Sequence, residues 1–232
     1  MLNTKDIKGS GQSGPSKTIE PGNHQCKIHG VSFEEPPYKQ GGLTVTLHVE
    51  GPDLGPNFEG FFLNKDQQEL GRYKGAIGRI KSSEWAYADG VTKTGVQISR
   101  DQEILKFLKT LCTALGTKAI KWLEEQDSKH DTIESLLTAF NNDQPFKDTY
   151  LNFCVAAKEY KNKAGYIAYD LFLPKFSKIG VPFEAIGTKP SRLLKYNDTD
   201  YLKKLKVTEV EQFGGGSNET PLSSESKQDF NL

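Results

Sequence analysis

Residues 149–174, TYLNFCVAAKEYKNKAGYIAYDLFLP, carry the main fold signal of the chain. Two runs of aromatic and aliphatic residues flank a polar centre, where Asn162 to Gly165 supply a turn signal. A turn signal between two apolar runs predicts an antiparallel β-hairpin. The chain therefore returns to β-structure after Pro145, and the elements before that point decide which fold the hairpin completes.

A second hairpin is expected near the start of the chain. Residues 23–33, NHQCKIHGVSF, are typical of a strand, and residues 41–51, GGLTVTLHVEG, alternate apolar and polar residues. Strict alternation predicts a half-buried strand with one wet face, and the PPYKQGG segment between the two strands supplies a turn. The apolar set is Leu43, Val45, Leu47 and Val49, and the polar set is Thr44, Thr46, His48 and Glu50. Residues 57–65, NFEGFFLNK, are expected to form a third strand.

A helical block separates these strands from the hairpin of residues 149–174. A capping box of Ser99 with Gln102 starts the first helix and Gly116 ends it. KAIKWLEE continues as a second short helix, and Asp131 with Glu134 is expected to cap a third. The apolar helix faces are Ile104, Phe107, Leu108, Leu111 and Leu115 in the first, and Ile133, Leu136, Leu137 and Phe140 in the third. Residues 64–100, between the third strand and the block, are expected to form an ordered loop with at most one short strand.

The element order is three strands, a helical block and two strands. This order is the layout of an OB-fold, so we expect a mostly β, α+β protein with a five-stranded OB-like Greek-key barrel. Residues 1–21 are expected to be a flexible arm, residues 22–212 the nucleic-acid-binding barrel domain with a helical insertion at 101–141, and residues 213–232 a flexible acidic tail. A short helix is expected around the TDYLKKL segment at residues 199–205.

The charge of the chain is unevenly distributed. Lys and Arg number 30 and Asp and Glu number 30, which gives zero net charge. Residues 146–206 carry 12 basic and 6 acidic residues, a sum of +6, whereas residues 207–232 carry 1 and 5, a sum of −4. A basic body followed by an acidic tail suggests a polyanionic partner for the body and a separate role for the tail.

Two segments place rings and positive charges side by side. Aromatic rings stack on bases and ammonium groups neutralise phosphates, so the pattern predicts a binding surface for single-stranded nucleic acid. The candidate residues are Arg72, Tyr73, Lys74, Arg79, Lys81, Trp85 and Tyr87 in the first segment, and Lys158, Tyr160, Lys161, Lys163 and Tyr166 in the second. The alternatives are that the hairpin tip is an ordinary solvated turn, or that some of these rings belong to the core.

Catalytic and metal-binding signatures are weak. His24, Cys26 and His29 lie close in sequence, but on a strand His29 points away from the other two, and no second pair completes a zinc tetrahedron. Asp148 with Glu159 and Lys161 has the form of a nuclease signature, yet a strand over residues 149–159 would separate the carboxylates by about 36 Å. We therefore expect no enzyme, no catalytic residues, no metal and no cofactor.

The cysteines and the hydropathy pattern indicate the cellular compartment of the protein. Cys26, Cys112 and Cys154 are odd in number and far apart, which favours buried thiols in a reducing compartment such as the cytoplasm. No apolar run approaches the roughly 18 residues of a membrane span, and the polar first residues lack the form of a signal peptide.

With these features, residues 22–232 resemble the single-stranded-DNA-binding proteins of bacteriophage replication systems. The resemblance rests on the strand order and on three segments: GRYKGAIGR with EWAY, KEYKNKAGYIAY, and the tail with GGG and QDFNL. It implies that the tail, through Glu219, Glu225, Asp229 and Phe230, docks on replication partners and competes with DNA.

The favoured interpretation is a non-enzymatic protein that coats single-stranded DNA with little sequence preference during phage replication or recombination. In a phage-infected cell this places it in the host cytoplasm. Its expected partners are single-stranded DNA and, through Asp229 and Phe230, a polymerase, helicase or recombinase, with no membrane contact. The alternative is a phage structural or assembly protein whose barrel makes protein contacts, and a metal-dependent nuclease is a further alternative.

Overall fold

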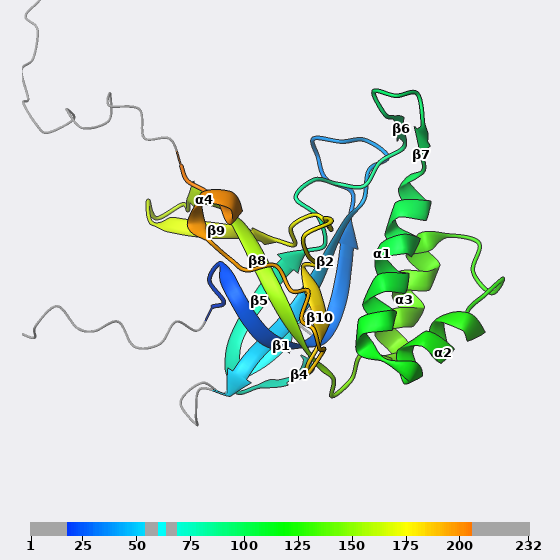
Figure 1. Cartoon of the computed structure of the whole chain (residues 1–232), viewed down its shortest axis with the longest axis horizontal. Helices are drawn as coiled ribbons and strands as arrows, with labels where there is room; N and C mark the ends of the chain where they lie inside the picture. The colour runs from blue at the N-terminus through cyan, green and yellow to red at the C-terminus, as the bar shows by residue number, and fades with distance from the viewer. Residues whose placement is uncertain (1–17, 54–59, 64–68, 206–232) are drawn as a thin grey trace, which may run out of the picture.

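The computed structural model describes residues 18–53, 60–63 and 69–205. Figure 1 shows a β-barrel with a separate group of helices packed on one side of it. The strands are β1 (Gly22–Glu34), β2 (Thr44–Asp53), β3 (Gly60–Leu63), β4 (Glu69–Tyr73), β5 (Gly75–Lys81), β6 (Gly90–Val91), β7 (Gln97–Ile98), β8 (Tyr150–Lys161), β9 (Ile167–Phe172), β10 (Phe183–Ala185) and β11 (Leu202–Lys203). The helices are α1 (Arg100–Leu115), α2 (Thr117–Glu125), α3 (Ile133–Asp143) and α4 (Asp198–Tyr201).

Five strands close the barrel in the order β1-β2-β5-β9-β8, and β8 returns to β1. All neighbours are antiparallel except β5 and β9, which run parallel where Ile80 faces Leu171. The helices α1 to α3 lie between β5 and β8 in the chain. This closure makes the fold an OB-like Greek-key barrel with a helical block between its third and fourth strands, which confirms the expected fold class.

The third barrel strand is not the segment predicted from sequence. Gly60–Leu63 is a strand, but it pairs with β4 in a separate two-stranded sheet, and the barrel uses Gly75–Lys81 instead. Glycine is required there by close packing: a Cβ on Gly75 would lie 2.4 Å from the carbonyl oxygen of Gly51, and one on Gly78 would lie 3.2 Å from Ile19. These glycines interrupt the apolar alternation, so the segment gives a weak strand signal.

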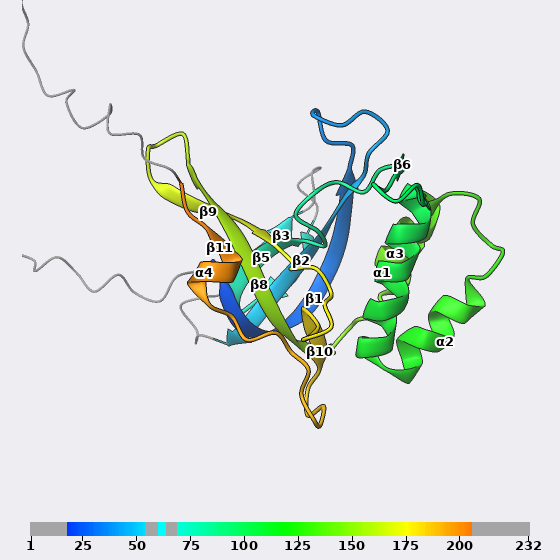
Figure 2. The same ribbon diagram turned by 45° about the horizontal axis from the view of Figure 1, so that its top comes forward.

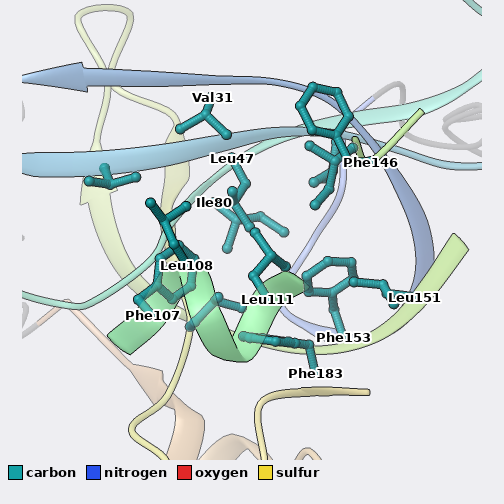
Figure 3. Packing of buried hydrophobic residues seen from close by; sticks show 14 of the residues in the cluster. Val31, Leu47, Ile80, Phe107, Leu108, Leu111, Phe146, Leu151, Phe153 and Phe183 are labelled. Carbon is teal, nitrogen blue, oxygen red and sulfur yellow. The ribbon is translucent and has the colours of Figure 1, made fainter. Parts of the chain in front are cut away.

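The core lies between the barrel interior and the helical block. The inward residues of β2, namely Leu43 just before the strand, then Val45, Leu47 and Val49, are all buried as predicted. Figure 3 shows Phe107, Leu108 and Leu111 of α1 pointing toward barrel residues that include Leu47 and Ile80. The helical block therefore closes one end of the barrel core, and its apolar stripes serve packing.

The observed helix starts agree in part with those predicted from the sequence. The Ser99 hydroxyl accepts a hydrogen bond from the Gln102 amide, and Gly116 follows the last residue of α1, as expected. The third helix begins one residue later than predicted, because its cap is Thr132, whose hydroxyl accepts from the Ser135 amide, and not Asp131. The Asn141 side chain then forms two hydrogen bonds with the main chain of Val31, which fixes α3 against β1.

The ends of the described chain pack on the barrel. Ile19 is buried and its amide donates to the carbonyl of Ile77, so Ile19 belongs to the barrel and not to the predicted flexible arm of residues 1–21. Residues 1–17 of that predicted arm lie outside the described residues. The predicted helix near residue 200 is the single turn α4, followed by β11, which pairs in parallel with β8. The predicted tail, residues 213–232, also lies outside the described part of the chain.

The three cysteines are buried free thiols, as expected, and burial raises the pKa of Cys26 to about 12. None of the helices in the described ranges combines the length and apolar character that a membrane crossing needs.

Candidate nucleic-acid interface

The outer wall of β2 and β5 carries polar and basic side chains. Arg79 faces His48 and Lys81 faces Thr46 across the antiparallel ladder, and cross-strand partners project from the same side of a sheet. Ile80 between the two basic residues is fully buried, so Arg79 and Lys81 point out of the barrel. In an OB-fold this outer wall of the second and third strands is a usual ligand face.

The positively charged wall continues across β9, β8 and β11. The Lys81 ammonium lies 2.8 Å from the Asp170 carboxylate of β9, and Asp170 pairs with Lys158 of β8. Lys158 in turn pairs with Lys203 of β11. Lys81, Asp170, Lys158 and Lys203 therefore form a charged row on one face, although they come from four strands.

The segment after β5 folds over this row. Glu84 accepts from Lys158 at 3.0 Å and from Lys203 at 2.5 Å. Burial works against the charged form of Glu84, but the hydrogen bonds from Lys203 and Lys158 outweigh it and hold the pKa below its ordinary value. Trp85 follows directly, and the Lys158 ammonium lies 4.0 Å from the centre of its ring. The two segments predicted from sequence, about 70 residues apart, thus meet at Trp85 and Lys158.

Three exposed rings stand at this end of the barrel. The exposed fractions are 57% for Trp85, 46% for Tyr160 and 72% for Tyr166. The hairpin turn is held by the Asn162 side-chain oxygen, which accepts from the amides of Ala164 and Tyr166 at 3.0 Å each. Figure 2 shows the β8–β9 hairpin extending beyond the barrel wall. The rings are therefore presented to solvent on an ordered support.

Tyr87 differs from these three rings because it is only partly exposed. Its main chain pairs with Leu43 through two hydrogen bonds of 2.8 and 2.9 Å, and its ring packs against the hydrophobic core. Burial raises the pKa of Tyr87 to about 12. Part of this ring therefore serves core packing, and its predicted contact with a base stays a prediction.

The remaining predicted residues lie around this surface or outside the described side chains. Lys161 and Lys163 are exposed at the hairpin turn, and Lys74 is exposed at the start of β5. The Lys74 amide donates to Glu50 at 2.6 Å. The structure gives no side-chain description for Arg72 and Tyr73, and Asp229 and Phe230 also lie outside the described residues.

Glu50 is buried, whereas the alternation of residues 41–51 predicted that it would lie on the solvent-exposed face of the strand. Its carboxylate is buried and accepts from the amides of Lys74 and Gly75, from Lys27 at 3.0 Å and from His29 at 2.5 Å. Burial opposes its charge, but these donors outweigh that effect and hold the pKa of Glu50 below its ordinary value. The group ties the bulge near the end of β2 to the start of β5, so Glu50 has a structural role.

Sequence reasoning missed the acidic partners of the basic residues. Asp170 and Glu84 were not predicted site residues, yet these carboxylates decide which lysines carry unneutralised charge. Lys203, which shares Glu84 with Lys158, was not predicted either. The period-two pattern of the hairpin placed Asp170 opposite the face of Leu171, but nothing in the sequence pairs Glu84 with residues 158 and 203. That pairing depends on the parallel contact of β5 with β9.

Comparisons with protein-family models, curated proteins and solved structures give no match for this chain. Within the described ranges no group of three or more His, Cys, Asp or Glu side chains is arranged to hold a metal ion.

Proposed function

We propose that this protein binds single-stranded DNA with little sequence preference, as a non-enzymatic coating protein. The observation that carries the proposal is the exposed Trp85 ring, held against the Lys158 ammonium on the outer wall of an OB-like barrel. An indole with one covered and one open face is a platform for a base, and the neighbouring ammonium groups suit phosphates.

The chemistry favours a single strand over a duplex. Trp85, Tyr160 and Tyr166 offer ring faces, and a duplex hides its base faces inside the stack. Every base has a π-face, so stacking on these rings discriminates little between sequences. Specific base recognition relies on side chains that form paired hydrogen bonds with base edges, and the surface is instead dominated by rings and ammonium groups.

We also propose a role in phage replication or recombination. This part rests only on the resemblance of several segments and of the tail to the single-stranded-DNA-binding proteins of bacteriophage replication systems. In that role the C-terminal residues, with Asp229 and Phe230, contact a replication partner. An anionic segment tethered to the domain would also compete with DNA for the basic wall. A pull-down with full-length protein and with Phe230→Ala tests this part separately from DNA binding.

The test of DNA binding is a titration of labelled oligo-dT followed by fluorescence anisotropy, with a duplex of equal length as competitor. We expect saturable binding to oligo-dT that the duplex displaces poorly, and no change in oligonucleotide length when magnesium is added. Equal affinity for duplex and single strand would contradict the stacking argument. Magnesium-dependent cleavage would favour the nuclease alternative.

A further inference from the structure

A second cluster of positive charge follows β9, and sequence reasoning did not assign it to the site. Residues 175–195 contain five exposed cations and one acidic residue. The cations are Lys175, Lys178, Lys189, Arg192 and Lys195. None of them forms an ion pair with another residue in the described part of the chain, whereas Lys81, Lys158 and Lys203 are each neutralised by a carboxylate.

The one acidic residue in this segment does not offset the cations at the surface. Glu184 is buried, and its two oxygens accept from the Ser191 hydroxyl at 2.5 Å and from the Arg192 amide at 2.9 Å. Its carboxylate thus fixes the main chain beside Arg192 and leaves the guanidinium at the surface. The exposed part of the segment is therefore strongly positive.

An exposed ring stands among these cations. Phe176 is 46% exposed, and its ring meets the ring of Phe183 edge-on, with the centroids 5.5 Å apart. Phe183 is buried and packs in turn against Phe153 and Phe107. Lys175 and Lys178 flank the ring in the chain. Phe176 is thus a supported ring with an accessible surface, as Trp85 is.

Main-chain contacts bring the two parts of the segment together. The Val181 amide donates to the Arg192 carbonyl at 2.8 Å, and the Leu194 amide donates to the Val181 carbonyl at 2.9 Å. Gly180 packs so tightly here that a Cβ would lie 2.7 Å from the Arg192 carbonyl oxygen. The Arg192 main chain is consequently held beside Gly180, four positions after Phe176 in the chain.

The cluster adjoins the site around Trp85. The Leu173 amide donates to the Lys81 carbonyl at 2.8 Å, so the chain leaves β9 directly beside the end of β5. Phe176 lies three positions after Leu173, a distance of at most about 11 Å along an extended chain. Figures 1 and 2 both show the segment after β9 passing close to the segment after β5.

We propose that Phe176, with Lys175, Lys178 and Arg192, is a second contact for the same single strand, one that stacks a base and binds phosphates beyond the Trp85 surface. This inference rests on the proposed function and adds a direction to it: the strand runs from the β8–β9 hairpin past Lys81 to Phe176. Because its cations are unpaired in the described chain, this contact supplies much of the salt-dependent affinity.

The test compares oligo-dT of about 4 and about 16 nucleotides, the limits of the usual site size of one OB-fold. The charge variant is Lys175→Gln/Lys178→Gln/Arg192→Gln. The matched control is Lys109→Gln/Lys118→Gln/Lys121→Gln, which removes three exposed charges from the helical block. We expect the charge variant, but not the control, to bind the longer oligonucleotide about tenfold more weakly and to lower the salt slope by about 2, since each single-strand phosphate contact contributes about 0.7.

Phe176→Ala provides a second readout, with thermal unfolding as a check on folding. We expect it to weaken binding of the longer oligonucleotide by about 5- to 150-fold, the range for loss of one stacked base. If the wild type binds and Trp85→Ala weakens binding, while the charge variant and folded Phe176→Ala behave like the control, the second contact is overturned and the proposed function stands. If the wild type binds no oligo-dT of either length, both proposals fail.

Discussion

The Lys158 ammonium lies 4.0 Å from the centre of the Trp85 ring, although 73 residues separate the two in the chain. The parallel pairing of β5 with β9 brings them together, because it sets the segment after β5 beside the β8–β9 hairpin. Glu84 holds the same ammonium at 3.0 Å. The ring is thereby covered on the cation side and open on the other.

Removing a hairpin ring should weaken DNA binding without unfolding the barrel. Tyr160 is 46% exposed, so Tyr160→Ala loses little core packing but removes a stacking surface, and we expect a loss of about 1–3 kcal/mol of binding free energy. The matched control is Tyr150→Ala at the other end of β8. Oligo-dT titration and thermal unfolding of both variants measure the effect. Equal binding losses in the two variants would remove Tyr160 from the site.

Releasing the lysines from Glu84 should strengthen binding. Glu84 neutralises both Lys158 and Lys203, and Glu84→Gln keeps the shape and one hydrogen-bonding oxygen while removing the charge. We expect tighter binding of oligo-dT at low salt and a steeper loss of affinity as salt rises, because more phosphate contacts then release counterions. Titrations at several salt concentrations check this. Weaker binding in the variant would show that Glu84 acts mainly by positioning Lys158 against Trp85.

The strands and helices whose apolar residues recur at regular spacing were predictable, because each of these elements buries one face. Leu47 and Val49 on β2, and Leu108 and Leu111 on α1, are buried as their spacing indicates. The third barrel strand was missed because glycines interrupt its apolar pattern: Gly75 lies against the main chain of Gly51, and Gly78 lies against the side chains of Ile19 and Val49.

The candidate site was predictable in residue type but not in charge. Composition identified rings and cations, and three of the rings are exposed. The neutralisation of the cations by Glu84 and Asp170 depends on contacts between strands far apart in sequence, and so does the packing of Tyr87 against the core. The Phe176 cluster was overlooked because residues 175–195 lack periodicity.

The barrel closure can be tested at Gly75. A Cβ there would lie 2.4 Å from the Gly51 carbonyl oxygen, a backbone atom that cannot turn aside. We expect Gly75→Ala to lower the free energy of unfolding by about 1–3 kcal/mol, as overpacking does. Gly90→Ala is the control, since a Cβ at Gly90 meets nothing within 4 Å. Urea unfolding compares them, and equal stabilities would contradict the pairing of β5 with β2 in this register.

His48 should make the fold less stable in mild acid. Burial, and then the Arg79 guanidinium, hold the pKa of His48 below its ordinary value of 6.5. The unfolded chain therefore binds more protons than the folded protein as pH falls below about 6.5, and the free energy of unfolding decreases. We expect His48→Gln to reduce this loss between about pH 7.5 and pH 5.5. Urea unfolding across this range measures it, and parallel profiles for the two proteins would assign the loss to other groups.

Trp85 can itself report whether single-stranded DNA stacks on its ring. The chain has two tryptophans, and Trp122 lies on α2, where its ring meets Phe140. In a Trp122→Phe background all indole emission comes from Trp85. We predict that oligo-dT quenches this emission saturably, with an affinity that falls as salt rises and that matches anisotropy of the labelled oligonucleotide. Binding seen by anisotropy with unchanged Trp85 emission would contradict stacking on Trp85, because the strand would then bind elsewhere on the protein.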